Sequence, residues 1–230
     1  MRLVCISDTH ALHRAAFGRE KPDTLPEGDI LLCAGDITNV GDVRDVYNFG
    51  EYFKKTNFKH KITIAGNHDF CFENQRLHAQ ELLNIAGWTY LHDNEVVIDG
   101  LKFYGSPWQP EFCNWAFNLP RGERLARVWD NIPLDTDVLI THGPPHGILD
   151  FTCYDKLHVG CEELLPRVMK IKPMLHLFGH IHETHGVHIE NGTTYVNASI
   201  CTLKYAPTNK PIVFDFDVIT GELNEVHDFK

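Results

Sequence analysis

The chain has 230 residues, of which 43% are hydrophobic and 23% are charged, and its formal net charge is −10. This composition is typical of a soluble globular protein and excludes disordered or collagen-like chains, and a chain of this length can fold without a disulfide or a structural metal. The negative charge disfavours a long nucleic-acid partner, because an acidic surface repels a phosphate backbone.

No apolar run approaches the roughly 18 residues that a membrane span requires, and the apolar stretch at residues 3–6 is too short for the core of a signal peptide. The seven cysteines are scattered, and none forms a C-x-x-C pair, so neither a zinc ribbon nor a disulfide framework is indicated. We therefore expect free thiols, a reducing and hence cytoplasmic location, and no membrane partner.

Short apolar runs of four to eight residues without internal proline predict strands. They occupy residues 2–7, 29–34, 61–65, 137–141, 174–178, 186–190, 193–197 and 211–218. Apolar residues three to four positions apart predict helices at 43–56, 75–86 and 161–170. Strands that alternate with helices predict parallel βαβ units, and the run of strands after residue 186 predicts an antiparallel portion. We expect one α/β domain over residues 1–230.

Polar clusters directly follow five of the predicted strands. They are Asp8-Thr9-His10, Gly35-Asp36, Gly66-Asn67-His68-Asp69, Thr141-His142-Gly143 and Gly179-His180-Ile181-His182. Ligands of open α/β sheets bind beyond the carboxyl ends of the strands, so we expect these clusters to form one site. Asp, Asn and His side chains suit divalent ions such as Mn²⁺, Zn²⁺ or Fe²⁺, whereas the thiolates of a closed structural zinc site are missing from all five clusters.

Each cluster alone has a purely structural explanation. Asp8 and His10 suit a turn or a helix cap, Gly35-Asp36 an ordinary turn, and Asn67-His68 a left-handed turn. His180 and His182 would point to opposite faces of a regular strand, so we expect either a loop there or a twisted backbone through which one of them binds the metal. The metal site is favoured because all five clusters occur together, each at a strand end.

The order D-x-H, G-D, G-N-H-D, H-G and G-H-x-H resembles the calcineurin-like metallophosphoesterase superfamily, and the match spans residues 8–182. Segments 141–145, 159–165 and 195–199 are similar to the small metallophosphoesterase-domain-containing proteins related to class III cyclic-nucleotide phosphodiesterases. The resemblance implies a four-layer α/β/β/α sandwich of mixed sheets with a centre of two divalent metal ions.

The resemblance also implies a role for each motif residue. The first ion would be bound by Asp8, His10, Asp36 and His182, and the second by Asp36 as a bridge together with Asn67, His142 and His180. His68 would be the general acid, and Asp69 would orient its ring and favour the imidazolium. A hydroxide between the ions would attack phosphorus, and His68 would protonate the leaving alkoxide.

Departures from other branches of the superfamily favour a small phosphodiester as the substrate. The arginines that clamp monoesters in phosphoprotein phosphatases are missing from segments 35–41 and 65–69, and no tyrosine occurs at 37–42, where purple acid phosphatases supply a ligand. The superfamily's DNA-repair nucleases would need a basic surface. Cyclic nucleotides are suggested by the resemblance alone. The alternatives are a non-catalytic scaffold for protein partners, like the retromer small subunit, and a lipid-linked pyrophosphatase.

Several further residues have open roles. Three histidines could line the rim of a pocket, namely His13, His146 and His185, while we expect His158 to be a solvated loop residue. The aromatic loop with Trp108, Phe112, Trp115 and Phe117 suits a packed loop, with base stacking by Trp108 or Trp115 as the alternative. The sequons at Asn191 and Asn197 are better explained as a hairpin turn and a strand end.

Overall fold

The computed structural model describes residues 1–227, which form two six-stranded sheets and one short strand pair. The first sheet has the order β14-β13-β1-β2-β3-β4. Its strands are β1 (Arg2–Ile6), β2 (Ile30–Cys33), β3 (His60–Thr63), β4 (Thr89–Tyr90), β13 (Ile212–Phe216) and β14 (Leu223–Val226). Strands β1 to β4 are parallel, and β13 is antiparallel to both β1 and β14.

The second sheet has the order β11-β12-β10-β9-β6-β5. Its strands are β5 (Asn94–Ile98), β6 (Leu101–Ser106), β9 (Val138–Thr141), β10 (Leu175–Phe178), β11 (Gly186–Glu190) and β12 (Thr193–Asn197). The four inner strands are parallel, and β5 and β11 pair antiparallel at the two edges. The short pair consists of β7 (Gln109–Pro110) and β8 (Asn118–Leu119).

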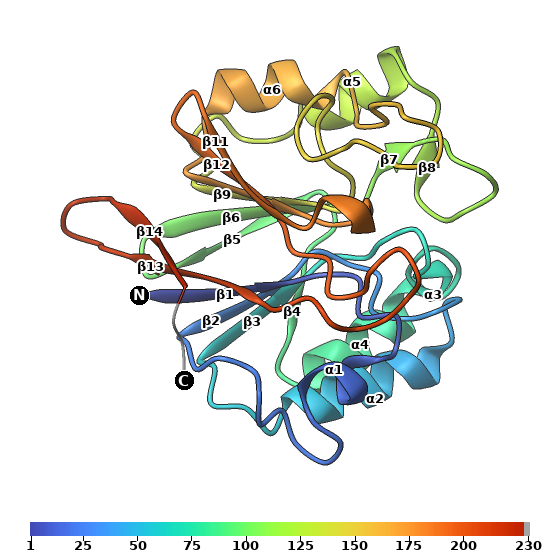
Figure 1. The fold of residues 1–230 in the computed structure, drawn as a ribbon, viewed down its shortest axis with the longest axis vertical. Helices are drawn as coiled ribbons and strands as arrows, with labels where there is room; N and C mark the ends of the chain where they lie inside the picture. Colours follow the sequence, from blue (N-terminus) through green and yellow to red (C-terminus); the bar gives the residue numbers. More distant parts are fainter. Residues whose placement is uncertain (228–230) are drawn as a thin grey trace.

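The two sheets lie face to face between two layers of helices (Figure 1). The first sheet is covered by α1 (His13–Phe17), α2 (Val43–Phe53), α3 (Phe70–Asn74) and α4 (Arg76–Ile85), and the second by α5 (Glu123–Trp129) and α6 (Leu164–Ile171). This arrangement confirms the predicted α/β/β/α sandwich of mixed sheets. None of the helices in the described residues is both long and apolar enough for a bilayer crossing.

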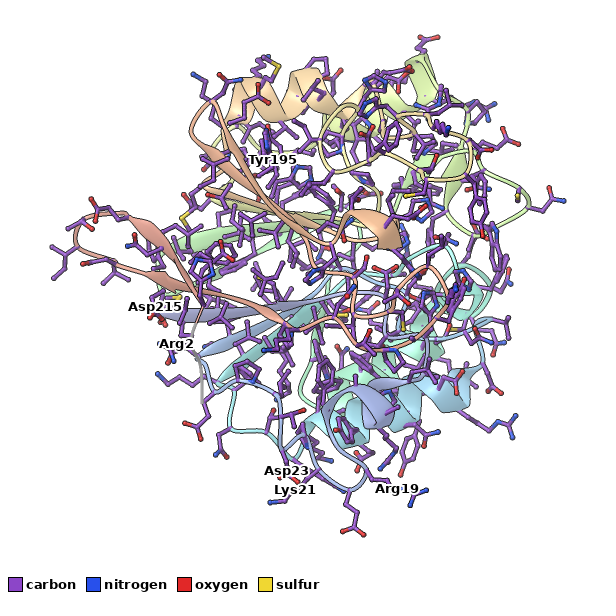
Figure 2. All side chains as sticks on the ribbon, in the orientation of Figure 1. Arg2, Arg19, Lys21, Asp23, Tyr195 and Asp215 are labelled. Carbon is purple, nitrogen blue, oxygen red and sulfur yellow. The ribbon has the colours of Figure 1, made fainter. Side chains whose placement is uncertain are left out.

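Alternation along the inner strands separates three apolar cores. On β1, Leu3 and Cys5 pack between the two sheets, whereas Val4 and Ile6 pack against the helices of the first sheet. A third cluster lies between the second sheet and α5 and α6, where Tyr195 is buried (Figure 2). Because successive side chains point to opposite faces and both faces are covered, these strands are continuous apolar runs, which is why they can be recognised in the sequence.

The predicted antiparallel portion is present but is divided between the sheets. β11 and β12 form the expected hairpin, and Asn191 and Gly192 both have positive φ, as a tight hairpin turn requires. β12, however, is also parallel to β10, and β13 joins the other sheet. There, Arg2 and Asp215 lie directly opposite each other and form an ion pair of 2.8 Å at the amino end of β1 (Figure 2).

Candidate metal centre

The loops that follow β1, β2, β3, β9 and β10 meet at the carboxyl end of the sheets. The Asp8 amide donates to the Gly35 carbonyl (3.0 Å), and the His68 amide donates to Asp36 Oδ1 (2.8 Å). The His180 amide donates to Asp8 Oδ2 (3.0 Å), which joins the two sheets. The expected convergence of the five polar clusters is therefore present.

A first group of ligand atoms comes from Asp8, His10 and His182, all within 4.8 Å of one another. His182 Nε2 lies 3.3 Å from Asp8 Oδ1 and 3.2 Å from His10 Nε2. His182 Nδ1 donates to the Thr202 carbonyl (3.1 Å), so its Nε2 is the nitrogen turned toward the group. Two imidazole nitrogens face each other and a carboxylate at this point.

A second group consists of Asp8, Asp36 and His142, again within 4.8 Å. His142 Nδ1 donates to the Ala34 carbonyl (2.8 Å), which directs its Nε2 toward Asn67 Oδ1 (2.8 Å) and Asp36 Oδ2 (3.4 Å). Asp36 Oδ2 also lies 3.8 Å from His10 Nε2. Asp36 thus faces both groups.

The electrostatics of these groups fit cations. Burial opposes ionisation of Asp8 and Asp36, yet the histidines that face them keep the pKa of both carboxyls below its usual range. In return, despite burial, Asp36 and Asp8 raise the pKa of His142 to about 9, and Asp8 raises the pKa of His182. The two buried carboxylates therefore stabilise a positive charge at two neighbouring points, as the ligands of a metal site do.

His180 stands slightly apart from these groups. Its ring lies beside His142, with 5.0 Å between the centroids, but it is not one of the residues whose ligand atoms cluster within 4.8 Å. Burial lowers its pKa to about 3, which leaves the ring neutral and able to act as a ligand. The predicted loop is confirmed: His180 has φ +66, and His182–Thr184 form a 3₁₀ turn.

Several candidate ligands have strained backbone. Asp8, His10, Asp36 and His180 all have left-handed φ values, between +42 and +66. Non-glycine residues in this region cost about 1–3 kcal/mol each and are concentrated at functional sites. The strain allows each loop to turn sharply at its strand end and to direct the side chain toward the common centre.

His68 lies beside the ligand groups, with a ring nitrogen within 4.8 Å of the ligand atoms of His10 and Asp36. Its Nδ1 lies 2.6 Å from the Asn39 carbonyl oxygen. The ring stacks on Trp115, with 4.1 Å between the centroids and 29° between the planes. A backbone carbonyl and an indole ring therefore fix the imidazole.

The expectation that Asp69 orients the His68 ring is wrong. The Asp69 carboxylate accepts hydrogen bonds from the Gly66 amide (2.8 Å), the Thr38 amide (2.9 Å) and the Thr38 hydroxyl (2.8 Å). Burial and the nearby Asp36 raise the pKa of Asp69 to about 6. Asp69 therefore joins the loops after β2 and β3. Although Asp69 and His68 are consecutive in the chain, their side chains face different directions.

A buried network that was not predicted supports the first group. Asn197 Nδ2 donates to the Ile181 carbonyl (2.8 Å) and so holds the turn between His180 and His182. The Ser199 hydroxyl faces Asp8 Oδ2 and Asn197 Oδ1, each at 2.9 Å. The only sequence signal for this network is a polar cluster at the end of a buried strand.

The other histidines whose roles were open lie in different surroundings. His13 is not a rim residue: it is 2% exposed and packs against Phe49, Tyr52 and Phe53. His158 is half exposed, as expected, but pairs with the buried Asp150 at 2.5 Å, and His146 lies beside it. His185 bonds the Lys210 carbonyl.

The side chains of the aromatic loop also differ in burial. Trp108 donates to Asp93 (2.7 Å) and packs against the buried Phe117, whereas Phe112 is 56% exposed. Tyr205, which was not predicted, is 44% exposed, with its ring 4.8 Å from that of His10. Phe112 and Tyr205 thus lie beside two candidate ligands, His180 and His10.

Comparison with known proteins places this centre in a family. A family model described as calcineurin-like phosphoesterase matches residues 1–184. The chain is 43% identical to metallophosphoesterase domain-containing protein 1 of Homo sapiens over 93% of this chain and 70% of that protein. It is 39% identical to a UPF0046 protein of Caenorhabditis elegans over 98% of this chain and 84% of that protein.

Solved structures agree with the fold. A Thermus thermophilus protein superposes with a TM-score of 0.62 at 15% identity, covering 98% of this chain and 97% of that chain. A protein described under "Structural and Functional Characterization of a Novel Archaeal Phosphodiesterase" superposes with a TM-score of 0.53 at 16% identity, covering 98% and 99%. At such identities the likeness shows the fold alone, while the family model and the sequence relatives show membership. The chain belongs to the calcineurin-like phosphoesterase family.

Proposed function

We propose that this protein hydrolyses small phosphodiesters with two divalent metal ions bound at the strand ends. The observation that carries the proposal is the convergence of Asp8, His10, Asp36, His142 and His182 in overlapping groups of ligand atoms. These buried donors come from distant parts of the chain, and two of them are carboxylates, which need a compensating positive charge. When bound, the ions would activate water and offset the charge of the phosphate.

The protein's own residues have separate tasks in this proposal. Asp36 faces both His10 and His142, so its carboxylate would be shared by the two ion positions, with Asn67 and His180 completing the second. His68 has its Nδ1 at the Asn39 carbonyl, which leaves Nε2 to carry a proton toward the centre. We assign His68 as the general acid that donates this proton to the leaving alkoxide.

The charge of the centre favours a diester over a monoester. Two carboxylates offset about half of the +4 charge of two divalent ions, and the attacking water offsets more when it loses its proton. The small positive remainder matches the single negative charge of a diester. A monoester dianion would need further cationic donors, and Arg121, which lies nearby, is bound to the Val159 (2.7 Å) and Gly160 (2.8 Å) carbonyls.

A substrate panel on reconstituted protein tests the proposal. Chelated protein is dialysed, supplied with Mn²⁺, Zn²⁺, Fe²⁺ or Mg²⁺, and assayed with bis(p-nitrophenyl) phosphate, p-nitrophenyl phosphate, and 2′,3′- and 3′,5′-cyclic nucleotides. We expect turnover that requires metal and favours the diester at least tenfold. Asp36→Asn should abolish it, whereas Asp135→Asn, at an exposed carboxylate, serves as the control. Full activity of the chelated protein, or inactivity with every metal and diester, would contradict the proposal.

A further inference from the structure

A cavity of about 310 Å³, the side pocket, opens beside the candidate metal centre. It is formed by residues of the segment before β8, of the loop 152–160 and of the turn that carries His180, which itself lines the cavity. This volume is at the small end of the roughly 300–1,000 Å³ of small-molecule sites. Because His180 is both a lining residue and a candidate metal ligand, the side pocket adjoins the metal centre, and its volume suits one ring system.

The rim of the side pocket is apolar and exposed. Phe112, Tyr154 and Leu203 are 56%, 81% and 40% exposed, and all three line the cavity. The ring of Phe112 lies 6.4 Å from that of His180, so the apolar rim begins next to a candidate metal ligand. Exposed aromatic side chains at the mouth of a concave site are suited to stack on a flat ring of a ligand.

The charges around the side pocket select against a second anionic group. Glu111, Asp155 and Glu183 line it. Arg121 is the one arginine among the described lining residues, and its guanidinium is held by two backbone carbonyls and Glu162. With carboxylates that outnumber an already paired guanidinium, the cavity repels a phosphate or carboxylate and accepts an uncharged ring.

The side pocket and the general acid serve different substituents of the phosphorus. His68 lies between Trp115 and the metal ligands, 6.3 Å from the Tyr205 ring, and none of these three residues is among the described residues that line the side pocket. The leaving group must lie within reach of the His68 proton. The side pocket is therefore left for the substituent that stays on the phosphorus.

We propose that the side pocket binds a flat, uncharged ring on the retained substituent of a phosphodiester, and that Phe112 and Tyr154 determine this specificity. The proposal rests on the proposed function, because it places the phosphorus at the metal centre. It names the substrate class as diesters whose retained group carries an aromatic or heterocyclic ring without a further phosphate.

Three synthetic diesters with one common leaving group test the proposal. Bis(p-nitrophenyl) phosphate, methyl p-nitrophenyl phosphate and p-carboxyphenyl p-nitrophenyl phosphate all release p-nitrophenolate and differ in the retained group. Phe112→Ala and Tyr154→Ala should each raise KM for the bis(p-nitrophenyl) ester roughly 5- to 150-fold, the range expected for loss of one stacking contact. The rise for the methyl ester should be at least five times smaller.

The carboxylate-bearing ester tests the charge selection. We expect its kcat/KM to be at least tenfold below that of the bis(p-nitrophenyl) ester, and Glu111→Gln combined with Asp155→Asn should recover most of the difference. Phe151→Ala is the matched control, because Phe151 is an exposed aromatic beside the same loop and is not among the described lining residues. Phe151→Ala should leave KM for the bis(p-nitrophenyl) ester and KM for the methyl ester unchanged.

The outcomes separate this proposal from the proposed function. Equal changes in KM for the aromatic and methyl esters, or no preference against the carboxylate, would overturn the side pocket as the specificity site while diesterase activity stands. Absence of turnover of all three esters by the wild-type protein with every metal would instead overturn the proposed function. Because Phe112 and Tyr154 are exposed, their variants should unfold at the wild-type temperature, which melting curves check.

Discussion

Ser199 and Ser7 offer a matched test of how the protein holds Asp8. Both serines are 0% exposed, and they are bridge partners between adjacent backbone segments. The Ser199 hydroxyl lies 2.9 Å from Asp8 Oδ2, whereas the Ser7 hydroxyl has no partner. Alanine at either position removes one buried hydroxyl, but only Ser199→Ala removes a hydrogen bond to a carboxylate.

The expected magnitudes follow from this difference. A hydrogen bond to a charged group contributes about 1.5–3 kcal/mol, so Ser199→Ala should lower the free energy of unfolding of the chelated protein by that amount. Loss of a group that orients a metal ligand typically weakens metal binding about 10- to 100-fold. Ser7→Ala should change the free energy of unfolding by less than about 1 kcal/mol and leave metal affinity nearly unchanged, because no hydrogen bond is lost.

Urea unfolding of the chelated proteins and calorimetric titration with Mn²⁺ measure the two quantities separately. Similar losses in both variants would show that the site responds to any nearby change in packing. Wild-type Mn²⁺ affinity in Ser199→Ala would show that Asp8 needs no support from Ser199, and would refute the reasoning.

Three further predictions concern the centre and the helical core. A Cβ on Gly179 would lie 1.9 Å from Asp8 Oδ2, so Gly179→Ala should weaken Mn²⁺ binding at least tenfold, whereas Gly143→Ala, whose Cβ would meet its nearest atom at 3.6 Å, should not; equal titration curves would contradict this. His68→Ala should retain its metals by elemental analysis but lose about 10²–10⁴-fold in kcat on alkyl diesters, with a much smaller loss on nitrophenyl esters; loss of metal would argue against its role as the acid. Burial lowers the pKa of His13 from 6.5 to about 4, so between these values the unfolded chain binds a proton that the folded chain does not. The free energy of unfolding therefore falls as the pH falls through this window, by up to roughly 3 kcal/mol. His13→Leu should weaken this pH dependence, measured by urea unfolding at several pH values. An unchanged pH dependence would rule out His13 as its source.

The parts of the fold that could be predicted are those with a period in the sequence. Apart from β6, the inner strands and α2, α4 and α6 combine burial with a clear apolar repeat, and their boundaries lie within a few residues of the prediction. The hairpin of β5 and β6 was missed, because three of the five residues of β5 are exposed and its apolar face consists of Val96 and Ile98 alone. Asp99 and Gly100, both with positive φ, were the available signal for its turn. α5 is only seven residues long, too short for its period to stand out.

The residues of the site could likewise be predicted only where the sequence carries a signal for them. Side chains that act through their own chemistry, such as Asp8, Asp36 and His142, are visible as polar clusters after strands. The groups that orient the site histidines cannot be recognised in the sequence, because they are backbone carbonyls and any residue could supply them. They are the carbonyls of Asn39 for His68, Ala34 for His142 and Thr202 for His182. The role of Asp69 in orienting His68 is implied by the family resemblance alone, whereas in the structure its carboxylate faces Thr38.

Anomalous diffraction from crystals of the Mn²⁺-loaded protein tests the central claim most directly. Two peaks should appear, one bounded by Asp8, His10, Asp36 and His182 and the other by Asp36, Asn67, His142 and His180. A single peak, or none among these residues at saturating Mn²⁺, would contradict a two-ion centre and the phosphodiesterase built on it.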